Sequence, residues 1–162
     1  MSSARKLLTF GGIALAAFGM LYGLHYALFV EHQTLDRMGG SLAAAFMNAA
    51  DGRMADAADA LNTYGETKYD YVRQVDVHSH WIGLAMLMIV LGVTFDSVAW
   101  GETARFWIGL ALLIGSAAFP AGVILQTVSH GSTIASGLAI AGSALVIASL
   151  AAVALGFVRQ AD

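Results

Sequence analysis

The chain's five histidines are its main candidates for chemistry, and all lie near the same end of long apolar segments. Imidazole is the commonest metal ligand in proteins, and an ionisable group is costly inside a membrane unless it serves a function. We therefore predict that these side chains bind a cofactor or a metal ion. They are His25, His32, His78, His80 and His130.

Their spacing determines which of them can act together. His25 and His32 are seven residues apart, so on a straight helix they share a face about 10 Å apart along the axis. His78 and His80 are two residues apart and, on a helix, point about 200° away from each other. One helix could then present ligands on two flanks. In an extended strand both imidazoles would face one way and could chelate one ion.

The elements that position these histidines are those of a membrane protein. Of the 162 residues, 58% are hydrophobic and 12% are charged, whereas a soluble domain carries about 25% charged residues. The sequence has no cysteine, which excludes disulfides, thiolate metal sites, iron–sulfur clusters and covalently attached c-type haem. The net charge of −3 gives no reason to expect a nucleic-acid partner.

Four apolar runs are long enough to cross a bilayer, since about 20 helical residues span its hydrocarbon core. The first run continues as far as Val30, so we interpret it as a retained span and not as a cleaved signal peptide. We predict an all-α integral membrane protein, a single domain over 1–162 built as an antiparallel bundle of four transmembrane helices. The spans are residues 7–30, 78–98, 106–128 and 133–158.

The segment 34–76 between spans one and two has apolar residues at helical spacing, among them Leu42, Phe46 and Leu61. This pattern predicts one or two amphipathic helices lying across the outer surface, with a break at Gly52. A solvated acidic linker is the alternative.

The distribution of charged residues predicts the orientation of the spans in the membrane. Arg5, Lys6, Arg105 and Arg159 flank the spans, while the segment 31–76 has four basic residues against eight acidic ones. The positive-inside rule then places both termini in the cytoplasm and the long loop outside. For a bacterial inner membrane, the loop and the histidines would face the periplasm.

Small residues predict close helix packing in the first and last spans. Such faces also permit homo- or hetero-oligomers without specifying one. Gly23 and Gly83 stand near histidines and could instead let a flat macrocycle approach the backbone, and Pro120 should kink the third span. The packing residues are Gly12, Ala16, Gly19 and Gly23 in span one, and Gly137, Ala141, Ala144, Ala148 and Ala152 in span four.

Helical bundles commonly hold haem between histidines of facing helices. In one scheme His25 pairs with one of the two histidines His78 and His80. The remaining one of these two then pairs with His130 or His32. The sequence does not determine which pairing forms. A ligating imidazole usually donates its second N–H to an acceptor. Candidate acceptors are Glu31, Asp76 and Gln126.

The segment Asp76-Val-His78-Ser-His80-Trp-Ile-Gly83 resembles the HxH helix of small bacterial membrane proteins related to the haem–copper oxidase catalytic subunit. The resemblance covers the start of one predicted helix. It implies haem ligation by His78 and His80, on opposite flanks of that helix. It does not imply oxygen reduction, because no spacing here reproduces the histidine cluster that holds the oxidase's copper.

The expected function is a b-type haem protein, with one or two haems near the outer face. It would transfer electrons as an oxidoreductase or a redox subunit, with quinol or an outer-side redox protein as its partner. The first alternative is a copper or zinc site for delivery or sensing, formed by His25, His78, His80 and His130. The second is a non-catalytic assembly subunit of a membrane complex. No catalytic residue is assigned.

Overall fold

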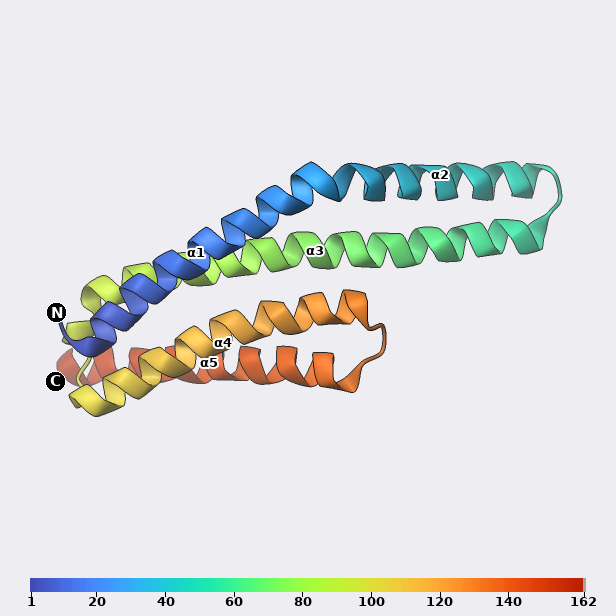
Figure 1. Cartoon of the computed structure of the whole chain (residues 1–162). Coiled ribbons are helices and arrows are strands. Elements are labelled where there is room, and N and C mark those ends of the chain that lie inside the picture. The colour runs from blue at the N-terminus through green and yellow to red at the C-terminus, as the bar shows by residue number, and fades with distance from the viewer. Residues whose placement is uncertain (162) are drawn as a thin grey trace. The chain divides into compact units, whose positions relative to one another are not determined.

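The structure is a computed structural model that describes residues 1–161, and these residues are almost entirely helical (Figure 1). They contain five α-helices and one short 3-10 helix and, over the same range, no strand, which confirms the predicted all-α class. The elements are α1 (Ser3–Phe29), α2 (Glu31–Ala50), α3 (Met54–Thr94), η1 (Phe95–Ser97), α4 (Glu102–Val128) and α5 (Thr133–Ala161).

Four helices are long and apolar enough to cross a membrane, as predicted: α1, α3 with its continuation to Ser97, α4 and α5. The end of α4 at Val128 and the start of α5 at Thr133 fall where the sequence predicts them. The second span differs, because its helix begins at Met54 and not near His78. Hydropathy marks where a helix becomes apolar, and α3 is already helical through the polar residues before that point.

The segment between the first two spans is helical, with one break. α2 ends at Ala50, and Gly52 has a φ of +76°, a left-handed conformation that glycine adopts without a steric penalty. The backbone N–H of Arg53 donates to the carbonyl of Asn48 at 2.8 Å and closes the turn. The predicted break at Gly52 is confirmed. That these helices lie across the outer surface stays a prediction.

The chain divides into two compact units, each described here by itself. Unit 1 comprises Met1–Leu21 and Val77–Asp162, and unit 2 comprises Tyr22–Asp76. Unit 1 therefore contains most of α1, the second half of α3, and all of α4 and α5. Unit 2 contains the end of α1 from Tyr22, all of α2 and the first part of α3.

In unit 1, glycines on α1 allow its close approach to α3. A Cβ at Gly12 would lie 2.8 Å from Cγ1 of Ile89 and 2.9 Å from the carbonyl oxygen of Ala85. A Cβ at Gly19 would lie 3.0 Å from Cβ of Trp81. Both glycines therefore serve helix contact, as their spacing predicts.

The helices α4 and α5 pack even more tightly (Figure 1). A Cβ at Gly122 would overlap the backbone nitrogen of Ala139, and one at Gly142 would overlap that of Phe119. The predicted contact face of α5 was wrong: a Cβ at Gly137 would have nothing within 4 Å, and Ala144 is exposed. Because α5 is apolar all round, its sequence does not show which line of small residues meets protein and which meets lipid.

At the end of unit 1 where α1 begins, three helices are connected by polar contacts around Asp96, in η1. The hydroxyl of Ser2 donates to the Asp96 carboxylate, and Nη1 of Arg5 lies 3.5 Å from it. Nη1 of Arg105 donates to the backbone carbonyl of Asp96 at 2.7 Å. These contacts join the start of α1, the end of α3 and the start of α4.

Candidate cofactor site

The two histidines of the HxH segment lie on one continuous helix, α3, which rules out the extended alternative. Nδ1 of His78 lies 3.0 Å from the carbonyl oxygen of Gly19 on α1. The ring of His80 lies edge-on to Phe119 of α4, with 4.9 Å between ring centroids and 83° between ring planes. The two imidazoles therefore contact different helices, in the directions that helical spacing requires.

The contact of His78 with Gly19 determines which ring nitrogen can bind a metal. A carbonyl oxygen only accepts hydrogen bonds, so Nδ1 must carry the proton and donate it. In the neutral imidazole Nε2 then holds the lone pair. A second nitrogen held by a backbone carbonyl is the usual arrangement of a metal-ligating histidine. Gly19 makes this contact feasible because it lets α1 approach α3 closely.

His80 is more open. Its side chain is exposed, and Gly83 lies three residues later, about 60° away around the helix. A Cβ at Gly83 would meet nothing within 4 Å, so this glycine does not serve helix packing. The backbone beside the exposed imidazole is therefore accessible to a large flat group.

An apolar cavity of about 540 Å³, wide open to the surroundings, lies in unit 1 among α1, α3 and α4. Its aromatic residues are Phe18 and Trp81, whose ring centroids lie 4.8 Å apart with planes at 80°. Trp81 follows His80 in the sequence, and Phe18 precedes Gly19, so the cavity adjoins the histidine pair. We call it the α1–α3–α4 cavity. Its lining residues are Gly11, Ala14, Leu15, Phe18, Trp81, Leu113, Ala117 and Ala121.

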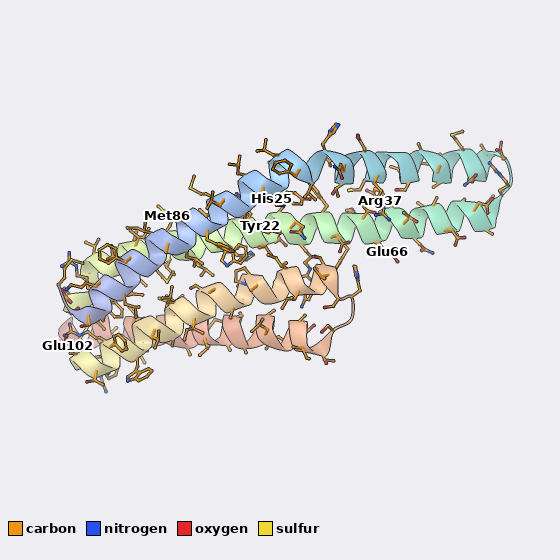
Figure 2. The ribbon with its side chains drawn as sticks, in the orientation of Figure 1. Tyr22, His25, Arg37, Glu66, Met86 and Glu102 are labelled. Carbon is orange, nitrogen blue, oxygen red and sulfur yellow. The ribbon has the colours of Figure 1, made fainter. Side chains whose placement is uncertain are left out.

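The other three histidines are exposed. His25, labelled on α1 in Figure 2, packs in unit 2 against Phe29 with 5.3 Å between ring centroids. His32 on α2 has Nε2 3.4 Å from the carboxylate of Asp36, and its side chain is 87% exposed. His130 stands in unit 1, in the turn between α4 and α5.

No group of three or more histidine, cysteine, aspartate or glutamate side chains within residues 1–161 is arranged to hold a metal ion. Within unit 1, three of the four histidines predicted for a copper or zinc site, His78, His80 and His130, are therefore not part of such a group. Haem needs fewer ligands from the protein than a small ion does, because the macrocycle supplies four ligands to the iron and the chain supplies one or two imidazoles.

The predicted hydrogen-bond acceptors have other identified contacts. A carboxylate oxygen of Glu31 accepts from the Tyr71 hydroxyl at 3.4 Å in unit 2. Nε2 of Gln126 donates to the hydroxyl of Ser136 at 3.3 Å, across the turn that carries His130. Asp76 is exposed on α3. The acceptor identified for His78 is a backbone carbonyl, which no residue type reveals in a sequence.

Sequence reasoning also missed a polar cavity of about 380 Å³ in unit 2. It lies between α2, which carries the labelled Arg37 of Figure 2, and α3. The lining residues are Val30, Gln33, Thr34, Arg37, Thr67 and Asp70.

Comparison with known proteins gives no matching family model, no similar curated protein and no similar solved structure. The function is therefore argued from the chemistry of the site itself.

Proposed function

We propose that this chain is a b-type haem-binding membrane protein that takes part in electron transfer. The observation that carries the proposal is the contact between Nδ1 of His78 and the carbonyl of Gly19 at 3.0 Å. It orients a half-buried imidazole at the start of the apolar part of α3 and leaves Nε2 as the metal-binding nitrogen.

His78 and His80 are the proposed axial ligands, one on each flank of α3. When bound, haem supplies an iron that changes its oxidation state by one electron. His78 would hold its haem in a fixed orientation, because both its helix and its Nδ1 are constrained. His80 would bind where Gly83 leaves the backbone open. The resemblance of the HxH segment supports the same two ligands.

One or two haems are compatible with this arrangement. His25, His32 and His130 remain candidates for further haem ligands, and Glu31, Asp76 and Gln126 remain candidate acceptors for the second N–H group of a ligating histidine. Quinol or an outer redox protein would be the electron-transfer partner.

We further propose that the four spans form an antiparallel bundle in a bacterial inner membrane, with the histidine-bearing ends toward the periplasm. The positions of Arg5, Lys6, Arg105 and Arg159 support cytoplasmic termini. The polar contacts around Asp96 would then lie at the cytoplasmic interface, where charged groups retain access to water.

The ligand assignment can be tested by replacing each imidazole and adding it back. We expect His80→Gly to lose the Soret band that its haem contributes, and free imidazole to restore it, because the small ligand can occupy the vacated position. His78→Gly should behave in the same way. Ser79→Ala, on the same turn, is the control and should keep the full absorbance.

Circular dichroism of each variant separates loss of a ligand from loss of the fold. Folded His78→Gly and His80→Gly variants that retain full haem absorbance would overturn the assignment of these ligands. Copper or zinc found at one equivalent per chain without haem would favour the metal-site alternative. Normal complex assembly with all five histidines replaced, and no cofactor in the native protein, would favour the assembly subunit.

A further inference from the structure

The α1–α3–α4 cavity provides a second binding site beside the histidine pair. We infer that it binds an isoprenoid quinone, with the aromatic pair Phe18 and Trp81 beside its ring and the other walls along its tail. This inference rests on the proposed haem function, because that function gives a redox-active lipid a reason to bind here. Binding itself can be measured independently of haem.

The composition of the cavity excludes most ligand classes. At about 540 Å³ it is within the usual range of small-molecule sites, roughly 300–1,000 Å³. None of its eight lining residues is charged, so ions, sugars and nucleotides would lose their hydration without gaining partners. No histidine lines it, so a haem placed there would have no axial ligand. The ligand class that these exclusions leave is an apolar molecule from the bilayer that contains no metal.

The shape of the cavity follows from small residues placed between larger ones. The short side chains of Ala14 on α1 and of Ala117 and Ala121 on α4 line the space, whereas a Cβ at Gly11 would already lie 3.0 Å from the side chain of Leu113. On α1 the lining extends from Gly11 to Phe18, about 10 Å along the helix at 1.5 Å per residue. An elongated apolar space of this kind suits several linked isoprene units.

The position of the cavity favours a quinone over an ordinary acyl chain. Trp81 is adjacent in sequence to His80, and Phe18 to Gly19, whose carbonyl binds His78. The cavity therefore has an aromatic end next to the two proposed haem ligands. Aromatic faces and edges bind a flat conjugated ring specifically, whereas a saturated chain gains only dispersion contacts.

Trp81 is itself the reporter for the test, because it is buried and lines the cavity. The full-length protein in detergent is titrated with decylubiquinone while tryptophan fluorescence is recorded, and Trp81→Phe identifies the contribution of Trp81. Trp107 is 62% exposed and reports collisional quenching by free quinone. We expect the Trp81 signal to saturate and the remaining signal to fall linearly.

Ala117→Phe fills the cavity and should weaken the saturating phase at least about tenfold, equivalent to roughly 1.4 kcal/mol. Ala148→Phe, on an exposed face of α5, is the matched control and should bind like the native chain. The Soret absorbance of the same samples reports haem separately, so a colourless protein that binds quinone refutes the haem proposal alone.

Three results would overturn the quinone site. The first is linear, unsaturable quenching of Trp81. The second is a saturating phase that Ala117→Phe leaves unchanged in a folded protein. The third is quenching of Trp81 by a brominated phospholipid that decylubiquinone fails to compete away, which would assign the cavity to acyl chains.

Discussion

At the scale of single residues, the protein distinguishes two histidines that are nearly adjacent in the sequence. His78 is held by a hydrogen bond from Nδ1 to a backbone carbonyl, whereas the identified ring contact of His80 is with Phe119. Their spacing alone predicts different directions. The acceptor of His78 could not be predicted, because every residue carries a carbonyl and only the close approach of α1 selects that of Gly19.

Gly19→Ala should disturb His78 without touching its ring. The new Cβ would lie 3.0 Å from Cβ of Trp81 and 3.3 Å from Cγ1 of Ile82, so α1 and α3 must adjust by a few tenths of an ångström. Overpacking of this kind costs about 1–3 kcal/mol of unfolding free energy. We expect weaker haem retention and a changed Soret maximum, measured by absorption and by denaturant titration.

Gly137→Ala is the control for the Gly19 substitution, because its Cβ would have nothing within 4 Å. It should be neutral or slightly stabilising, since alanine favours a helix over glycine by about 0.5–1 kcal/mol. Equal effects of the two substitutions would contradict the assigned role of Gly19.

For Ser116 we expect a substitution that does not destabilise the protein, in contrast to Gly19→Ala. Its hydroxyl is fully buried on α4 and has no hydrogen-bond partner in the described part of the chain. A buried hydroxyl without a partner is destabilising, so Ser116→Ala should leave the free energy of unfolding unchanged or raise it by about 1 kcal/mol. Denaturant titration checks this, and a loss of more than about 1 kcal/mol would show that Ser116 has a polar partner.

At the scale of elements, the helices could be predicted more completely than the faces by which they pack. Four apolar runs indicate four spans, and the glycines of α1 do meet α3. On α5, however, Gly137 is open while Gly142 contacts α4. An all-apolar helix gives no amphipathic signal, and lipid is as apolar as a neighbouring helix, so sequence does not locate this interface.

Gly122→Leu should separate α4 from α5, because even a Cβ at this position overlaps the backbone of Ala139. We expect the variant to be destabilised by about 3 kcal/mol or more, since backbone atoms cannot move aside as a side chain can. Gly137→Leu places the same side chain on an open face of α5 and should remain close to the native stability. Thermal unfolding in detergent compares the two, and similar melting temperatures would contradict the packing of α4 on α5.

At the scale of the whole molecule, the proposed orientation follows from charge. The chain contains no cysteine, so single introduced cysteines report sidedness without background. In intact spheroplasts, a membrane-impermeant maleimide should label Ala50→Cys, near the break at Gly52, and Val128→Cys, at the end of α4. Glu102→Cys, at the start of α4, should be labelled only after lysis. The reverse pattern would place the histidine-bearing ends in the cytoplasm.

The central claim is that these histidines bind haem, and an absorption spectrum tests it most directly. The full chain, expressed with ample haem supply and purified, should show a Soret band and the reduced pyridine haemochrome of haem b, at one or two haems per chain. A folded protein that is colourless under these conditions would contradict the claim.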